Sequence, residues 1–438
     1  MQPTRSPSPS EQVTLDKPLS ATNIEPTKAE DEPVKTLPLT FPDGGLRAWS
    51  NIAGCFLLAF TSYGQLNAFG VFQTYYSQTL LRGHSVSAIA WIGSTQLTIS
   101  YIAGSVLGRM FDIYGSKILL VSGCFLSTFC LMMTSLATKY YQILLAQGIG
   151  LGIGIAVQFY PILAVPSHWF RANRAAAIGI VVAGSSLSGI IYPIMLSRLF
   201  DSVGFPWAVR ILAFMNFGCQ ILAIPLVKER LPPRLGVPLI DWLAFRETTF
   251  LLHALGGFLV AFALYTPYWY IELFSLQKGV GANLSFYMIA IMNATGLVGR
   301  VVTGYVADKY GRFNTLVPVT LLCGISALAI WSTSQHTAEI VVFAVIFGFT
   351  SASYSSLAST ATAQVTSDPS RIGARTGMFM TAMSPGILTG PSIAGAIVDS
   401  SNGGYLGLQI FVGVFLVAGA ALALAARWNG ARSLAAVF

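Results

Sequence analysis

The sequence GRMFDIYGSK at residues 108–117 decides how this chain folds, because a second copy of its pattern, GYVADKYGR, occurs at residues 304–312. Both copies read Gly-x-x-x-Asp-x-x-Gly followed by a basic residue, and each follows the second apolar stretch of its half of the chain. A loop repeated at matching positions predicts two halves of similar architecture. The residues of the pattern are Gly108, Asp112, Gly115, Gly304, Asp308, Gly311 and Arg312.

The composition indicates a chain that lies in a lipid bilayer. Of its 438 residues, 54% are hydrophobic and 10% are charged, whereas soluble domains carry about 25% charged residues. Twelve apolar stretches approach the roughly 20 residues that a spanning helix needs. We therefore predict an all-α membrane protein with twelve transmembrane helices in two six-helix, pseudo-symmetric bundles. The predicted spans are 49–73, 86–108, 117–137, 141–163, 174–199, 207–226, 249–271, 283–306, 314–333, 338–361, 372–397 and 406–426.

Polar stretches divide the chain into five parts. We predict a disordered tail (1–40), a first bundle (41–226), a connector (227–248), a second bundle (249–427) and a short tail (428–438). The first tail lacks the apolar core that a signal peptide would have. Lys and Arg are concentrated in the loops on the side of the membrane where the two motif copies lie. Because such loops stay in the cytoplasm, both termini are expected there. We expect the plasma membrane as the location, with the vacuole or another internal membrane as the alternative.

Several activities lack the residues that they need. The sequence contains neither a Gly-x-x-x-x-Gly-Lys-Ser/Thr phosphate loop nor a nucleophile elbow, so ATP use and hydrolytic catalysis are not expected. The histidines are scattered and the cysteines fall within apolar spans, which favours packing over metal binding. The net charge of +8 follows from the loop bias and does not indicate nucleic acid. We expect a lipid-embedded protein that is not an enzyme and holds no cofactor or metal.

The carboxylates of the two motif copies are predicted to hold the bundles together on the cytoplasmic side. An Asp just beyond a helix end can accept hydrogen bonds from the N-terminus of a neighbouring helix. The adjacent glycines permit a sharp turn and close approach. Asp112 and Asp308 would then form a latch that breaks when the protein opens toward the cytoplasm. The alternative is an ordinary turn with solvated charges.

Arg300 is the one ionisable residue clearly inside a predicted span, and such residues mark functional sites. Asn293 lies two helical turns earlier on the same face. A guanidinium offers two parallel donors to a carboxylate, which favours an organic-acid substrate. Structural pairing with Asp308 is the alternative role for Arg300.

Polar and aromatic residues of the first, fourth and seventh spans complete the predicted substrate site. Such side chains suit a planar organic anion, through stacking and hydrogen bonds. The alternative for each of them is helix packing or the aromatic belt at the membrane interface. These residues are Tyr63, Asn67, Gln158, Tyr265, Tyr268 and Trp269.

Three further segments carry a resemblance to a known family. DGGLRAW at residues 43–49 precedes the first span, and HWFRANRAAAIGIVVAG at residues 168–184 enters the fifth. Together with the duplicated loop, they resemble the major facilitator superfamily and, within it, the monocarboxylate porter family. GVFQTYY at residues 70–76 is similar to the fungal branch of that family.

The resemblance implies roles for three residues. Arg300 aligns with the arginine that binds substrate in the monocarboxylate porters, and Asp43 and Arg174 belong to segments that would couple to the gate. From the residues alone, Asp43 is expected to cap the first helix and Arg174 to cap the fifth.

The chain departs from the family pattern at three positions. Asn67 replaces a lysine of the animal members, Gly296 replaces an aspartate, and Ile113 replaces an arginine of the loop signature. No Asp or Glu occupies the middle of any predicted span. Compared with the family pattern, these departures disfavour lactate–proton symport by the usual route. They favour facilitated movement or export of a larger organic acid.

We therefore predict secondary active or facilitated transport of small to medium organic acids by alternating access, with protons as a possible co-substrate and a secondary metabolite as a possible cargo. Uptake of a planar nutrient such as riboflavin is an alternative, and a non-transporting nutrient sensor is another. Asn283 fits the Asn-x-Ser glycosylation pattern, but it lies too close to the membrane for modification to be expected.

Overall fold

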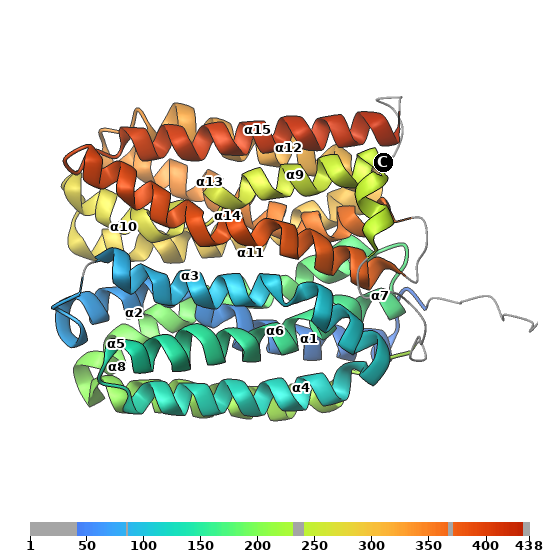
Figure 1. Cartoon of the computed structure of the whole chain (residues 1–438), viewed down its shortest axis with the longest axis horizontal. Coiled ribbons are helices and arrows are strands. Elements are labelled where there is room, and N and C mark those ends of the chain that lie inside the picture. The colour runs from blue at the N-terminus through green and yellow to red at the C-terminus, as the bar shows by residue number, and fades with distance from the viewer. Residues whose placement is uncertain (1–41, 85, 231–240, 367–370, 432–438) are drawn as a thin grey trace, which may run out of the picture. The chain divides into compact units, whose positions relative to one another are not determined.

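The computed structural model describes residues 42–84, 86–230, 241–366 and 371–431. The predicted tails (1–40 and 428–438) and the middle of the connector therefore lie wholly or largely outside the described residues. Within the described ranges every regular element is a helix, as the sequence predicts. Apart from short interruptions, each of the twelve predicted spans is helical to within two residues of its predicted ends. In Figure 1 the helices up to α8, blue to green, lie together, and the helices from α9 onward, yellow to red, lie together.

The first half contains helices α1 to α8. Two predicted spans lie in the long helix α8 because Gly204, with a φ of 78°, turns the chain inside it, and Gly115, with a φ of 76°, does the same in α4. The elements are α1 (Leu46–Asn67), α2 (Phe69–Tyr75), a π-helical turn (Tyr76–Leu80), α3 (Val86–Ile102), α4 (Gly104–Leu136), α5 (Tyr140–Ile143), a π-helical turn (Leu144–Gly150), α6 (Leu151–Ala164), α7 (Pro166–Trp169), α8 (Arg174–Ala223) and a 3₁₀ turn (Ile224–Leu226).

The second half repeats this plan with helices α9 to α15. Its first span is interrupted at Leu264 and Tyr265, as the first span of the other half is interrupted at Ala68. The elements are a 3₁₀ turn (Trp242–Arg246), α9 (Thr248–Ala263), α10 (Thr266–Gln277), α11 (Ala282–Tyr310), α12 (Arg312–Ile325), a π-helical turn (Ser326–Trp331), α13 (Thr337–Gln364), α14 (Ile372–Ser400) and α15 (Leu406–Gly430).

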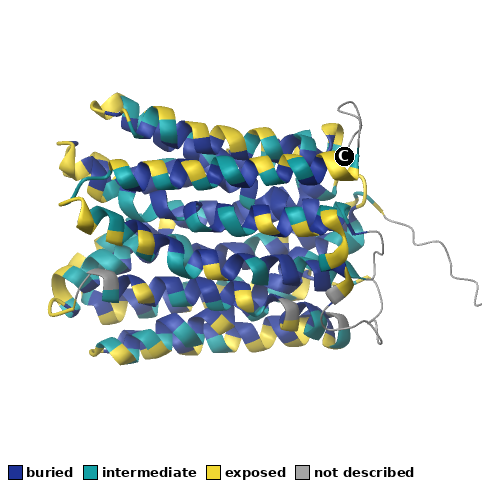
Figure 2. Ribbon diagram, turned by 45° about the horizontal axis from the view of Figure 1, so that its top comes forward, coloured by how far each residue is buried: buried dark blue, intermediate teal, exposed yellow. Residues whose placement is uncertain are grey.

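The apolar surface of the described helices agrees with a lipid environment. Nine helical stretches in the described ranges are long and apolar enough to cross a membrane, and one of them, Arg174–Leu226, contains two predicted spans. Large apolar side chains such as Phe125, Phe214 and Leu222 are exposed along these helices. Figure 2 shows buried residues between the helices and exposed ones distributed along their outer faces.

Glycines bring helices of the same half into backbone contact at corresponding places. A Cβ atom on Gly184 of α8 would lie 2.3 Å from the carbonyl oxygen of Phe56 in α1. A Cβ atom on Gly390 of α14 would lie 2.2 Å from the carbonyl oxygen of Phe262 in α9. At both glycines the absence of a side chain lets the two helices touch through backbone atoms. Since lipid supplies no hydrophobic force between helices, such close contacts supply much of the bundle's stability.

Substituting these glycines is expected to destabilise the bundles. Gly184→Ala and Gly390→Ala each force two helices apart, at a cost of about 1–3 kcal/mol. The melting temperature of the purified protein in detergent should fall for both variants. Gly218→Ala is the matched control, because Gly218 is exposed on α8 and nothing lies within 4 Å of the added methyl group. Equal melting temperatures for all three variants would contradict this account of the packing.

Candidate functional site

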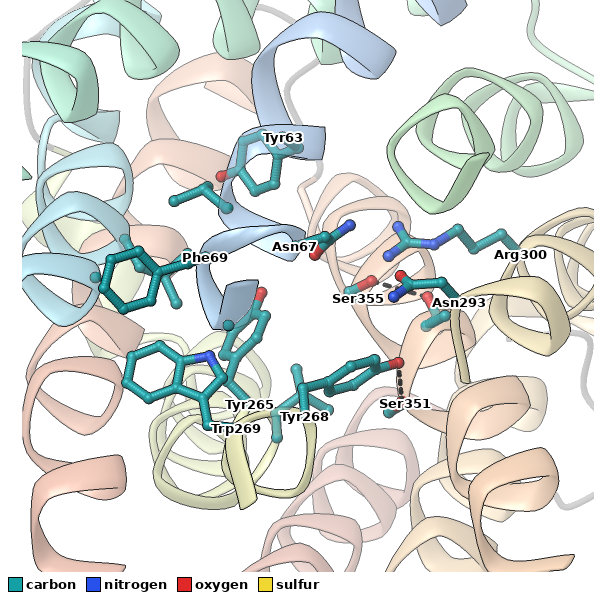
Figure 3. Close-up of a pocket in the computed structure, with 16 residues that line it drawn as sticks. Tyr63, Asn67, Phe69, Tyr265, Tyr268, Trp269, Asn293, Arg300, Ser351 and Ser355 are labelled. Carbon is teal, nitrogen blue, oxygen red and sulfur yellow. Dashed lines mark hydrogen bonds between the residues drawn. The ribbon is translucent and has the colours of Figure 1, made fainter. Parts of the chain in front are cut away.

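A cavity lies where the two interrupted spans meet the middle of α11 and α13. Its volume is about 720 Å³, including the part open to solvent. Both halves of the chain line it, as expected for a transporter built from two repeats. The lining residues labelled in Figure 3 are Tyr63, Asn67, Phe69, Tyr265, Tyr268, Trp269, Asn293, Arg300, Ser351 and Ser355.

Arg300 supplies the positive charge of the cavity. Its guanidinium points toward Asn67 of the other half, beside the amide of Asn293 (Figure 3). The Nε atom is buried and has no hydrogen-bond partner among the described residues. A buried donor without a partner is costly and unusual, so this side chain is poised to bind a ligand.

The two asparagines are oriented by backbone carbonyls. Asn67 Nδ2 donates to the carbonyl oxygen of Ser185 at 2.8 Å, and Asn293 Nδ2 donates to that of Ile289 at 3.0 Å. Each of these bonds uses one of the two amide hydrogens, so each side chain keeps one N–H donor and its acceptor oxygen. The cavity therefore combines one cationic donor with neutral polar groups around it.

Aromatic side chains form the remaining walls. The rings of Phe69 and Trp269 lie 5.9 Å apart at one end of the cavity, where Gly93 leaves room for the Phe69 ring. The hydroxyl groups of Tyr101 in α3 and Tyr265 are 2.6 Å apart, so they form a hydrogen bond between the two halves. These walls suit a planar, partly apolar solute.

Close packing between α8 and α11 sets the position of Arg300. A Cβ atom on Gly179 of α8 would lie 2.4 Å from the carbonyl oxygen of Arg300, and one on Gly189 would lie 2.5 Å from Asn293 Oδ1. Only glycine allows α11 to approach this closely. The two cavity residues of α11 are thus held by the opposite half of the chain.

Seven of the eight residues predicted to bind substrate line the cavity, and Gln158 does not. Gln158 is buried in α6, where its Nε2 donates to Ser127 Oγ of α4 at 3.1 Å. Its amide belongs to helix packing inside the first half. Ser351 and Ser355 of α13 were not predicted, because the run TSASYSSLASTAT at residues 350–362 indicates a polar helix without indicating which of its faces meets the cavity.

The second motif copy joins the two halves at the motif end, defined as the end where residues 108–117 and 304–312 lie. Asp308 accepts hydrogen bonds from the backbone N–H groups of Ala175, at 3.0 Å, and Ala176, at 2.8 Å, in the first turn of α8. Arg312 lies 3.9 Å from the same carboxylate. A carboxylate on a helix N-terminus is favourable, because it meets unpaired N–H groups and the positive end of the dipole.

The first motif copy makes a different set of contacts. The side chain of Asp112 lies outside the described part of the structure. A Cβ atom on Gly108 would lie 3.1 Å from the carbonyl oxygen of Gly373, so α4 packs closely on α14. After the turn at Gly115, Ser116 donates from its backbone N–H and, at 2.7 Å, from its hydroxyl to Glu229 of the connector.

The prediction that Asp43 caps the first helix is wrong. Gly45 is the N-cap residue of α1. Asp43 instead accepts hydrogen bonds from the backbone N–H groups of Arg171, at 2.6 Å, and Ala172, at 2.9 Å, just before α8. Its own N–H donates to the carbonyl oxygen of Trp169, which turns the carboxylate toward that loop.

The remaining predicted gate and surface residues lie at the two ends of the bundles. Arg174 is the first residue of α8, with a buried Nε near Asp308. Gly304 packs on α8, since a Cβ atom there would lie 2.7 Å from the carbonyl oxygen of Ala175. Gly311, with a φ of 101°, precedes α12. Asn283 is exposed in the first turn of α11, at the opposite end.

The connector is bound to both halves. The carbonyl oxygen of Lys228 accepts hydrogen bonds from Asn51 Nδ2 and Trp169 Nε1 in the first half. In the second half, Arg375 of α14 binds Asp241 at 3.0 Å and Glu247 at 2.5 Å. Burial alone would raise the pKa of Asp241, but the hydrogen bonds from Arg375 and Arg371 outweigh burial and hold that pKa below its usual value.

These features define a membrane transporter with a central cavity between two repeated halves. Residues 55–335 match the profile of the Major Facilitator Superfamily, and residues 255–428 match that of the family "Sugar (and other) transporter". The chain belongs to the Major Facilitator Superfamily, whose members are transporters and not enzymes.

Relatives with this fold span most of the chain. It is 43% identical over 393 residues to MFS-type transporter 1 of Ophiocordyceps sp. (strain BCC 1869), covering 89% of this chain and 87% of the relative. It is 39% identical over 406 residues to the Aspyridones efflux protein apdF of Emericella nidulans, covering 92% and 81%. The solved structure of the human organic anion transporter MFSD10 (TETRAN) has the same fold, with a TM-score of 0.67 and 13% identity over 87% of this chain and 99% of that one.

Neutralising Asp308 is expected to weaken the contact at the motif end. Asp308→Asn removes the charge and one acceptor facing the N–H groups of α8, which costs about 1–2 kcal/mol and shifts the equilibrium between conformations about 5–30-fold. A cysteine placed at Ser355, in a chain without its native cysteines, reports the shift. A charged thiol reagent supplied from the motif end should modify it faster in the variant.

Asp201→Asn provides the control for this measurement. Asp201 is exposed near the turn at Gly204, far along α8 from the motif end. Its replacement should leave the modification rate unchanged. If Asp308→Asn also leaves the rate unchanged, the Asp308 contact does not restrain opening.

Proposed function

We propose that this chain exports a small to medium organic anion, monocarboxylate-like in its charge, by alternating exposure of the cavity. The observation that carries the proposal is the Arg300 guanidinium, which points into the cavity without a carboxylate of the described residues to pair with it. A carboxylate would accept two of its N–H groups. Arg300, Asn67, Asn293, Tyr63, Tyr265, Tyr268 and Trp269 are the proposed binding residues.

The direction of transport is inferred from the relatives. Two proteins that this chain resembles are named efflux proteins, for aspyridones and for fujikurins. Export from the cytoplasm across the plasma membrane, with both termini cytoplasmic, agrees with the basic loops at the motif end. The sequence blocks at residues 43–49 and 168–184 support placement near the monocarboxylate porters within the superfamily.

The alternation itself would use the contacts between the halves. At the motif end α8 packs on α11 through Asp308 and Gly304, and α4 packs on α14 through Gly108. Separation of these pairs would open the cavity toward that end. Asp43 and Arg174 flank the same loop and are proposed to respond to its movement.

Loss of the Arg300 charge is expected to abolish transport. Removing one partner of a buried, hydrogen-bonded charge pair costs about 2–5 kcal/mol, so Arg300→Ala should reduce saturable flux at least 30-fold. The measurement is efflux of radiolabelled 4-aminohippurate, a planar monocarboxylate that crosses lipid slowly, from vesicles containing the purified chain. Arg300→Lys should restore flux only in part, because a lysine cannot bind a carboxylate with two parallel N–H donors.

Arg47→Ala is the control, because Arg47 is exposed at the start of α1 and outside the cavity. Wild-type flux in the Arg300→Ala variant would remove this residue from the site. Flux of riboflavin and not of the acid would favour nutrient uptake, and absence of flux for both would favour a sensor.

A further inference from the structure

The positive charge of Arg300 is not compensated by any described group of the cavity. Asp308, Asp241 and Glu247 form ion pairs with other arginines, and Arg300 takes part in none of these pairs. Asp308 lies eight residues further along α11, about 12 Å away along the helix axis. Its carboxylate is already bound to the N-terminus of α8.

The other polar groups of the cavity are neutral. They are amides, hydroxyl groups and an indole, and they come from both halves. His253, the buried histidine of α9, does not line the cavity. Its ring stacks on Phe379 with 4.4 Å between centroids, and its Nε2 lies 3.1 Å from Thr362 Oγ1. No described carboxyl group therefore lines the cavity to neutralise Arg300.

This charge affects the two legs of a transport cycle differently. Between its open states a carrier of this kind passes through a conformation in which the cavity is closed at both ends and loses water. Closing the cavity around an unpaired guanidinium incurs its desolvation cost without any attraction in return. With an organic anion bound, the same closure buries a neutral, hydrogen-bonded pair.

We propose that the chain works as an anion exchanger, in which the cavity changes sides with an anion bound in both directions. One organic anion leaves as a second anion enters, so a monoanion exchanged for a monoanion moves no net charge. This inference rests on the proposed function, because it takes Arg300 as the residue that binds the exported anion. It adds that the return of the empty carrier is the slow step of the cycle. An external anion binds the carrier, so that the carrier returns loaded and this slow step is avoided.

The experiment compares net efflux with exchange in the same vesicles. Vesicles containing the full chain are loaded with radiolabelled 4-aminohippurate, and potassium with valinomycin holds the membrane potential at zero. The external solution contains dextran sulfate alone, a polyanion too large for the cavity, dextran sulfate with unlabelled 4-aminohippurate, or chloride. External 4-aminohippurate is expected to accelerate efflux at least tenfold, and tenfold corresponds to about 1.4 kcal/mol in the barrier for the empty carrier.

Each outcome of this comparison has a definite meaning. Acceleration by chloride alone also supports exchange, with an inorganic anion on the return leg. Saturable, Arg300-dependent efflux at equal rates in all three solutions overturns the exchanger and leaves the proposed function intact. Absence of Arg300-dependent efflux in every solution overturns both.

A second variant tests whether the uncompensated charge is the cause. Asn293→Asp keeps the shape of the side chain and adds a carboxylate next to Arg300 (Figure 3). The empty cavity then becomes neutral, so the acceleration by external anion should fall from at least tenfold to less than threefold. Asn283→Asp makes the same chemical change on the same helix outside the cavity, where the side chain is exposed, and should retain the wild-type ratio. A wild-type ratio in Asn293→Asp would overturn the proposed cause and the exchanger with it.

Discussion

The close contact between α8 and α11 fixes both the cavity and the motif end of this protein. Along this contact Gly304 lies against Ala175, Gly179 against the backbone of Arg300, and Gly189 against Asn293. Each pair has one member from either half of the chain. Because the helices touch through backbone atoms, a movement of one half at the motif end also moves the residues that line the cavity. The binding residues of the cavity and the loop of the second motif copy are therefore expected to move together.

The two motif copies have the same sequence pattern but different surroundings. The second copy uses its carboxylate on the N-terminus of α8, across the boundary between the halves. The loop of the first copy is bound by Glu229, a residue of the connector, which reaches Ser116 after the turn at Gly115. The repeat thus gives two similar helix pairs, whereas the contacts that restrain them differ.

The sequence alone predicted an all-helical fold in two similar halves and the residues of α11 that line the cavity. These features depend on local patterns: apolar length, glycine at turns, and a single charge inside a span. Gln158 lies elsewhere because an amide in an apolar helix packs equally well inside one half, and periodicity cannot tell which face meets which neighbour. Asp43 binds the loop before α8 and not α1, because a contact across 128 positions leaves no trace in the local pattern.

The residues missed by sequence reasoning share a physical reason. Ser351 and Ser355 lie in a helix that is rich in small polar residues on several faces, so no stripe singles them out. Phe69 was also missed, because it meets the predicted residue Trp269 only where the first span of each half is interrupted near the cavity. Such pairings depend on three-dimensional packing between halves, which a one-dimensional pattern does not contain.

The connector has one more consequence, because its two ends are held by different halves. Glu229 is bound beside α4 and Asp241 beside α14, with twelve peptide units between them. A fully stretched chain of that length reaches about 40 Å. The covalent chain therefore sets an upper limit on the distance between these two residues when the halves move apart at the motif end.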